Sequence, residues 1–212
     1  TYNTSIADMA MYYQAPVNLI NNGIRPTLEV TGNTGEQPRR ALLHFNLSSL
    51  PGGITITNAD LRLRRQGGNN TSQTIDVYRV TTDWNEGTLN NAANTLASNG
   101  STWYGPTFST KWNTIGGDFT TTNGASLTGL TVNNTIYTWN VSTITQGWYN
   151  STFANYGFIV KDLTEGTNND KIFNSREDGT AANRPTLRIT YNPGNVTVDI
   201  VADRDNWIYE ST

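Results

Sequence analysis

The residues that most often carry out catalysis are scarce in this chain. Its single histidine, His44, lies in a segment of alternating apolar residues, where a histidine is more often structural or surface-exposed than a general base. One histidine without any cysteine cannot form a usual zinc site or an activated thiol nucleophile. Asp83 and Glu86 are a close carboxylate pair beside an aromatic residue, and we interpret them as turn residues rather than as the spaced pair of a glycosidase. We therefore predict that the chain is not an enzyme.

The basic residues are better candidates for function, because 11 of the 14 are Arg and only 3 are Lys. A guanidinium group holds a carboxylate through two hydrogen bonds, whereas an ammonium group acts as a point charge. This composition suits a ligand with repeated carboxylates, such as an acidic polysaccharide. The alternative is that each Arg pairs with a neighbouring acid and contributes under about 1 kcal/mol. The cations that we expect to bind the ligand are Arg25, Arg62, Arg64, Arg65, Lys111 and Arg176.

Two tryptophans provide a competing mode of binding. Trp103 and Trp112 lie in a turn-rich stretch from residue 90 to 135, where we expect them to be exposed and able to stack on sugar rings. Binding through these two rings would favour a neutral sugar. Trp139 lies within an alternating strand and is expected in the core, and Trp148 is expected to pack a short helix against it.

Short alternating segments separated by Gly and Asn turns indicate the elements that must position these side chains. They predict an all-β protein, an antiparallel, jelly-roll-like β-sandwich. The exception is STITQGWY at 142–149, which predicts a short helix that begins with Ser142 as its cap. The expected strands are 41–47, 75–80, 135–141, 156–161, 171–174 and 186–191, with a further apolar alternation from Ile54 to Leu63.

Length and charge restrict the class of protein further. The 212 residues can form one large β-domain without crosslinks. A net charge of −3 and a pI near 5.1 argue against nucleic-acid binding. No segment is apolar enough to span a membrane. The abundance of Thr and Asn, with few Lys and no Cys, indicates a secreted or cell-surface protein.

The end of the chain indicates a tandem arrangement. We expect a module at 1–191, a linker at 192–195, and a segment at 196–212 that is a tail or the start of a following repeat. Residues 200–209 resemble residues 6–12, and aligning Asp8 with Asp205 also aligns Tyr12 with Tyr209. Adjacent domains of the same polypeptide would then be partners, and deletion of 196–212 should leave thermal stability nearly unchanged.

An ordered series of motifs runs along the chain after an opening strand with Asp8: Asn22-Gly23, Leu28-Glu29-Val30, RALLHFNLSSLP at 40–51, ADLRL at 59–63, VYRVT at 77–81, DWNEGT at 83–88, QGW at 146–148, NYGF at 155–158, SRE at 175–177 and RPTLRITY at 184–191. This series resembles the disaggregatase-related (DNRLRE) repeat of methanogenic archaea, which is classed with carbohydrate-binding module family 96. The resemblance covers residues 1 to about 191, and Gly116-Gly117-Asp118-Phe119 is close to the archaeal version. It implies a non-catalytic β-sandwich that binds uronic-acid-containing polysaccharides, within a larger surface protein or a polysaccharide-degrading enzyme such as disaggregatase.

Two alternatives to ligand binding remain open from the sequence. The chain can be a structural spacer in a cell-surface array with no ligand of its own, or a fragment of an enzyme that lacks the catalytic part. Ca²⁺ is a candidate structural ion, because β-sandwich modules often hold it through carboxylates and carbonyls. Asp8, Glu177 and Asp178 are weak candidates as its ligands, since their spacing does not require a metal.

Overall fold

A computed structural model describes residues 7–13, 19–30, 37–165, 168–192 and 196–201, with backbone alone for the last segment. Short strands dominate it, as the alternating segments predict. In chain order the elements are β1 (Ala7–Tyr12), β2 (Ile20–Asn21), β3 (Thr27–Val30), β4 (Arg39–His44), β5 (Thr55–Gly68), β6 (Thr74–Val80), β7 (Ala92–Ala93), β8 (Phe119–Thr128), β9 (Thr135–Asn140), α1 (Ser142–Tyr149), β10 (Phe158–Asp162), β11 (Lys171–Asn174), a 3-10 turn (Ala181–Asn183), β12 (Thr186–Asn192) and β13 (Val196–Val201).

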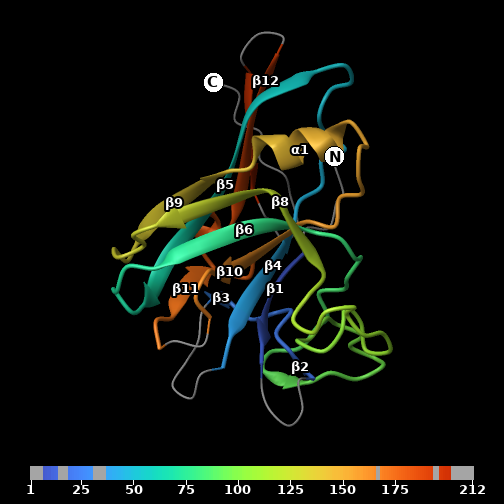
Figure 1. Ribbon diagram of the computed structural model, residues 1–212, viewed down its shortest axis with the longest axis vertical. Coiled ribbons are helices and arrows are strands. Elements are labelled where there is room, and N and C mark those ends of the chain that lie inside the picture. The colour runs from blue at the N-terminus through green and yellow to red at the C-terminus, as the bar shows by residue number, and fades with distance from the viewer. Residues whose placement is uncertain (1–6, 14–18, 31–36, 166–167, 193–195, 202–212) are drawn as a thin grey trace.

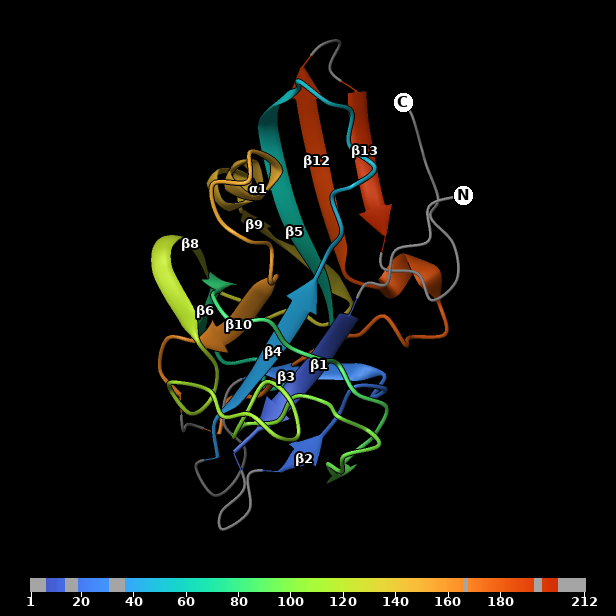
Figure 2. The same cartoon turned by 90° about the vertical axis from the view of Figure 1, so that its right-hand side faces the viewer.

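Two antiparallel sheets form a sandwich (Figures 1 and 2). The first sheet has the strand order β1-β4-β10-β6-β8, and the second has the order β13-β12-β5-β11-β3 with β9 also paired to β5. A small ribbon of β2 and β7 lies beside the first sheet, because β2 contacts β1. The expected all-β, jelly-roll-like sandwich with one short α-helix is therefore confirmed.

The main core lies between the two sheets, and strand periodicity explains its composition. Alternate residues of a strand point to opposite faces, so Leu61 and Leu63 of β5 face inward toward Phe158 and Val160 of β10. Trp139 is 1% exposed and Trp148 is 5% exposed, which confirms both as core residues. Since the sheets cover each other only on these inner faces, the outer faces decide where a ligand can bind.

The outer face of the first sheet carries a second hydrophobic cluster that the sequence did not predict. Met9, Leu42 and Ile159 point away from the main core, and the connection between β6 and β8 covers them. Trp84, Trp103 and Trp112 of this connection pack onto the strands. Leu42 is therefore fully buried although it alternates with the core residues Ala41 and Leu43.

The same connection ends in a strand that the sequence analysis missed. β8 is polar and mostly exposed, with only Ala125 and Leu127 packed against the main core. A strand at the edge of a sheet needs few apolar side chains, so it gives a weak alternating signal. The turn-rich stretch from 90 to 135 therefore contains a strand that its sequence pattern does not predict.

The helix α1 has the expected boundaries but not the expected cap. Val141 occupies the N-cap position without a side-chain hydrogen bond, and Ser142 Oγ instead accepts a hydrogen bond from the backbone NH of Ala59 in β5. Ser142 therefore attaches the start of the helix to β5 of the second sheet and does not cap the helix. No helix in the described part of the chain is long and apolar enough to cross a membrane.

The segment after the expected linker extends the second sheet. Val196–Val201 pairs with β12 in antiparallel register, from Tyr191 opposite Val196 to Thr186 opposite Val201. Asn192 belongs to β12, while residues 193–195 and the remainder of the sequence repeat at 202–212 lie outside the described residues. The first part of the tail is thus a strand of this sandwich, and the tandem repeat stays a prediction.

Candidate functional site

The expected cluster of basic residues on β5 separates into two faces. Arg62 and Arg64 alternate with Leu61 and Leu63 and lie on the outer face, where Arg64 donates hydrogen bonds to the carbonyl and side-chain oxygens of Asn134. Arg65 has the same parity as the core leucines and is fully buried. Its Nη2 donates to the carbonyls of Gly68 and Asn69 at 3.0 and 2.7 Å. A ligand at the outer face cannot reach Arg65, so placing it in a surface cluster was wrong.

Two more of the predicted cations are held by acids of the protein. Arg25 Nη2 lies 2.6 Å from Glu29, which Arg39 also contacts. Arg176 donates to both oxygens of Glu86, at 2.7 and 2.6 Å, and its Nε lies 3.1 Å from Glu177. Arg25 and Arg176 therefore each pair with acids of the protein, which is the alternative to ligand binding that the sequence left open.

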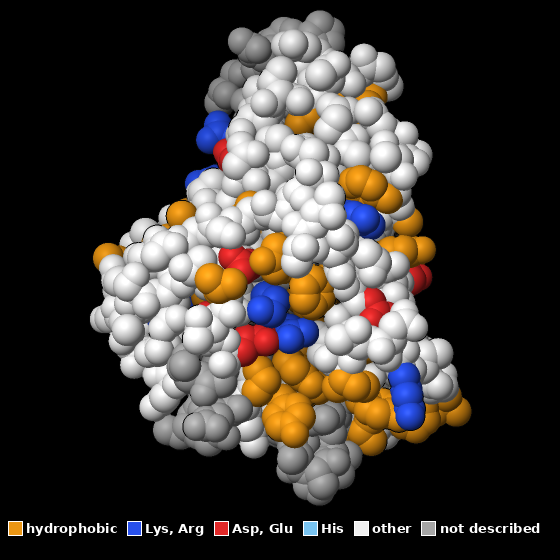
Figure 3. All heavy atoms as spheres, viewed as in Figure 1, with side chains coloured by type: hydrophobic (Ala, Val, Ile, Leu, Met, Phe, Trp, Pro, Cys, Tyr) orange, Lys and Arg blue, Asp and Glu red, His pale blue; other side chains and the backbone are white. Residues whose placement is uncertain are grey.

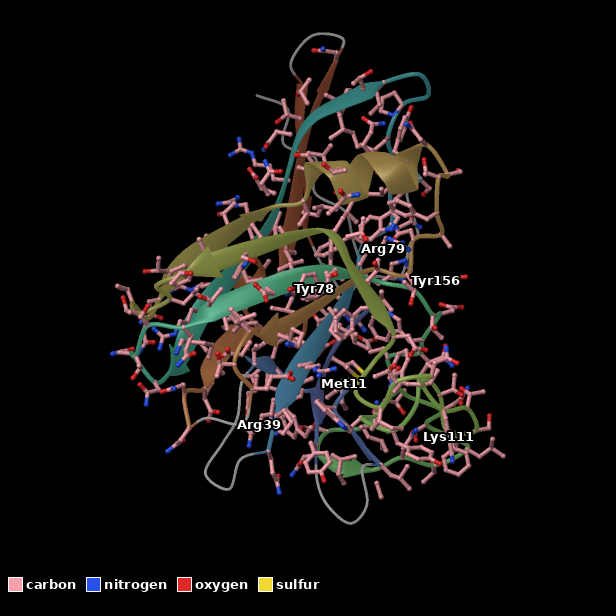
Figure 4. The ribbon with its side chains drawn as sticks, in the orientation of Figure 1. Met11, Arg39, Tyr78, Arg79, Lys111 and Tyr156 are labelled. Atoms are coloured by element: carbon pink, nitrogen blue, oxygen red, sulfur yellow. The ribbon has the colours of Figure 1, made fainter. Side chains whose placement is uncertain are left out.

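Lys111 does not join the other predicted cations. It is exposed on the connection between β7 and β8, where its Nζ lies 4.9 Å from the centre of the Tyr104 ring (Figure 4). That connection covers the outer face of the first sheet, whereas Arg62 and Arg64 lie on the outer face of the second sheet. The six predicted cations therefore do not form one binding surface.

The two candidate tryptophans are buried, contrary to the expectation of exposure. Trp103 is 4% exposed and Trp112 is 3% exposed. The Arg40 guanidinium lies over Trp103 at 4.8 Å, and Tyr13 contacts the same ring edge-on. The indole NH of Trp112 donates to the carbonyl of Thr102 at 3.0 Å. Both rings therefore hold the loop against the first sheet, and neither offers a free face to a sugar.

The part of the first sheet that the loop leaves uncovered holds a different set of charges. The Arg40 guanidinium donates to both carboxylate oxygens of Glu165, at 2.7 and 2.8 Å, and Lys161 Nζ lies 3.8 Å from the same carboxylate. The side chains of Arg40, Lys161 and Glu165 are each between 12% and 18% exposed. Figure 3 shows Lys and Arg side chains in the middle of this face, next to acidic and hydrophobic ones. Two cations thus surround one carboxylate at the surface.

An aromatic pair lies beside these charges. Tyr78 of β6 is labelled in Figure 4. Its ring stacks on that of Phe119 of β8, with ring centres 5.5 Å apart and planes 6° from parallel, and Arg40 lies 5.6 Å from the Phe119 ring. The Tyr78 hydroxyl donates to Asp76 at 2.9 Å, which fixes the ring. Gly124 is required behind it, because a Cβ there would lie 2.3 Å from the Tyr78 ring. Both aromatic rings are partly exposed.

A separate cleft of about 640 Å³ lies between the start of β5, α1 and the turn after α1. Gln146 and Asn150 are joined by a hydrogen bond of 2.9 Å along one wall. Phe153 is covered on one side by the Arg79 guanidinium, 4.0 Å from the ring centre. The lining offers amide and hydroxyl groups without a charge: Ile54, Thr55, Ile56, Asn123, Ser142, Thr143, Gln146, Gly147, Asn150, Thr152 and Phe153.

Three acids from distant parts of the sequence meet around Arg176. One oxygen from each of Asp8, Glu86 and Glu177 lies within 4.8 Å of the other two. Asp178, the third residue suggested by sequence, is not among them and instead accepts hydrogen bonds from Thr180 and Asn174. Burial is the main cause that raises the pKa of Glu86 to about 7 and that of Asp8 well above its ordinary value.

The sequence identified two of these three acids but not their partner, since Glu86 was interpreted as part of a turn with Asp83. Asp83 is exposed and accepts a hydrogen bond from the backbone NH of Trp84, so it lies apart from the three acids. Lys161, Glu165, Tyr78 and Phe119 were also missed as surface candidates. Strand alternation could have identified Lys161: it follows the core residue Val160, so its side chain points to the opposite, outer face of the sheet.

Comparison with known proteins supports one class of function. A search of the curated proteins gives no match. Carbohydrate-binding modules are typically non-catalytic, in agreement with the scarcity of catalytic residues. A family model matches residues 12–115, a region that includes Arg40 and Tyr78 but ends before Phe119, Lys161 and Glu165. Residues 12–115 match the family model of carbohydrate-binding module family 96, which supports a carbohydrate-binding module.

Proposed function

We propose that the chain is a non-catalytic module that binds an acidic, uronic-acid-containing polysaccharide on the uncovered face of the first sheet. The observation that carries this proposal is the bidentate contact between Arg40 and Glu165, with Lys161 as a second cation. A uronate has the same carboxylate group as Glu165. The site is therefore arranged for a carboxylate and is filled by one from the protein's own chain.

Glu165 differs from the acids that hold the other arginines. Glu29 belongs to a strand, and its side chain is only 8% exposed. Glu165 follows β10 in a turn and its side chain is 18% exposed. A carboxylate in a surface turn can be displaced at lower cost than one buried in a sheet. Arg40 would then bind the ligand while Trp103 below it keeps the guanidinium oriented.

Tyr78 and Phe119 supply the apolar part of the proposed site. The C–H face of a pyranose ring packs against aromatic side chains, and Tyr and Phe bury large areas at little entropic cost. With Arg40 next to Phe119, one sugar can contact both a ring and a cation. We place the protein at a cell surface or outside the cell, where such polysaccharides occur.

The experiment compares two forms of one polymer by isothermal titration calorimetry. We expect polygalacturonate to bind and its fully methyl-esterified form, which lacks the charge, to bind at least tenfold more weakly. Arg40→Gln should weaken binding by about 10–150-fold, since hydrogen bonds to charged groups contribute about 1.5–3 kcal/mol. Arg40→Lys should recover only part of this loss. Glu165→Gln should strengthen binding, because it removes the competing carboxylate.

The controls separate the proposal from its alternatives. Binding of polygalacturonate should weaken as salt is raised from 0.1 to 1 M, because the Debye length falls from about 10 to about 3 Å. Equal binding of the ester, with no effect of salt or of Arg40→Gln, would contradict an acidic ligand. Failure to bind any glycan would favour a structural spacer in a tandem array.

A neutral glycan in the cleft beside α1 is the second candidate, because that lining has hydrogen-bonding groups without charge. Gln146→Ala should then abolish binding of a neutral polymer while Arg40→Gln has no effect. Gln146 also accepts a hydrogen bond from the backbone NH of Ile56, so the folded fraction of this variant must be measured. Asn123→Ala, in the part of the lining that β8 contributes, is the second variant for the same cleft.

A further inference from the structure

The acids around Arg176 form a buried cluster rich in negative charge. Among the described residues, the carboxylates of Asp8, Glu86 and Glu177 gather around one guanidinium, that of Arg176. The side chains of Glu86 and Glu177 are only 14% and 5% exposed, and Asp8 is 1% exposed. Carboxylates held this close together under burial repel one another, so a proton or a cation bound there would stabilise the cluster.

One atom in this cluster lacks the contact that its burial demands. Asp8 Oδ2 accepts a hydrogen bond from the backbone NH of Arg176 at 2.8 Å. Asp8 Oδ1 is buried and has no hydrogen-bond partner among the described residues. Buried polar atoms in folded proteins are nearly always satisfied, so an orphaned carboxylate oxygen beside two other carboxylates indicates a missing ligand.

We propose that Asp8, Glu86 and Glu177 bind one Ca²⁺ ion. A divalent cation would offset the repulsion among the three carboxylates and give Asp8 Oδ1 a partner. Ca²⁺ binds carboxylate oxygens at about 2.3–2.6 Å, so its ligand atoms lie within about 5 Å of one another, as the three acids do. Mg²⁺ is a poorer candidate, because it keeps several waters and demands a strict octahedron.

The ion would connect three parts of the fold. Asp8 lies on β1 of the first sheet, Glu86 lies in the covering loop, and Glu177 follows β11 of the second sheet. The backbone NH of Asp8 already donates to Glu86 at 2.8 Å, and Arg176 joins Glu86 to Glu177. The role that we infer is therefore structural, separate from the proposed polysaccharide site.

The test uses the full chain stripped with EDTA and titrated with CaCl₂ without polysaccharide. We expect one Ca²⁺ per chain by calorimetry. At free Ca²⁺ 100-fold above the Kd, Tm should rise by about 5–11 °C. Asp8→Asn should lower the affinity at least tenfold and remove this rise. Asp83→Asn is the matched control, since Asp83 is exposed and outside the cluster, and it should bind Ca²⁺ like the wild type.

Two results would overturn the proposal. If the wild type binds no Ca²⁺ and Asp8→Asn raises Tm, a proton on Asp8 balances the cluster instead. If Asp8→Asn binds Ca²⁺ as tightly as the wild type, the ion lies elsewhere. Should Asp8→Asn fail to fold, Glu177→Gln provides the same comparison, because Gln keeps the shape of the side chain and removes one charge.

Discussion

The two sheets differ in what covers their outer faces. The first sheet is packed on both sides over much of its area, because the loop with Trp84, Trp103 and Trp112 lies on its outer face. On the second sheet, the outer-facing residues of β5 are polar, with Arg62 and Arg64 among them. The packed layer on the first sheet therefore supports a charged side chain from below, as Trp103 supports Arg40. Arg40 rests on Trp103, whereas no such ring contact is found for Arg62 or Arg64 among the described residues.

The largest expected effect tests the two faces of β5 with adjacent residues. Arg65→Ala should lower the free energy of unfolding by about 2–4 kcal/mol, because it empties a fully buried position and removes the hydrogen bonds from Nη2 to the carbonyls of Gly68 and Asn69. Arg64→Ala on the outer face should cost under about 0.5 kcal/mol. Urea unfolding of both variants measures the contrast, and equal losses would contradict it.

The second prediction concerns the edge of the second sheet. Deletion of residues 196–212 removes β13 and exposes the edge of β12 along six residue pairs. We expect Tm to fall by more than about 4 °C, which corresponds to roughly 1–2 kcal/mol for a chain of this size. This replaces the expectation from sequence that the deletion has little effect. Scanning calorimetry of the shortened chain tests it, and an unchanged Tm would restore the original expectation.

The smallest effect tests the loop that covers the first sheet. Asp118 accepts hydrogen bonds from the backbone NH groups of Thr114 and Asn113, at 2.8 and 3.0 Å, and from the hydroxyl of Thr82 at 2.9 Å. Burial alone would raise the pKa of Asp118, but these hydrogen bonds together hold it below its ordinary value. We expect Asp118→Asn to cost about 1 kcal/mol at pH 7.

The pH dependence gives the sign of this effect. A carboxyl group with a lowered pKa stabilises the fold above its unfolded pKa of about 3.9, and this contribution is lost as the pH falls through the folded value. The difference between wild type and Asp118→Asn should therefore shrink in acid. Urea unfolding at pH 7 and below pH 3.5 measures it. A difference that stays constant with pH would mean that the carboxylate charge is unimportant.

Much of the fold followed from local pattern. β11 and α1 have the boundaries that the sequence predicts, and β9 differs by one residue. These segments carry their own signals, since alternation and a helical Ile144–Trp148 spacing depend only on neighbours in the chain. β8 was missed because its position at the edge of the sheet, not its composition, makes it a strand.

The candidate sites depended on contacts between distant parts of the chain. The sequence by itself determined an all-β fold, an excess of Arg over Lys and the presence of Asp8 and Glu177 as candidate ligands. Only the tertiary structure decided that Glu86 joins them, that Arg65 points inward, and that Trp103 is buried beneath Arg40. The physical reason is that residue type sets which contacts a side chain can make, while burial and pairing depend on what folds over it. Arg40 and Arg65 are the same residue in two strands, and only their neighbours make one a surface candidate and the other a core residue.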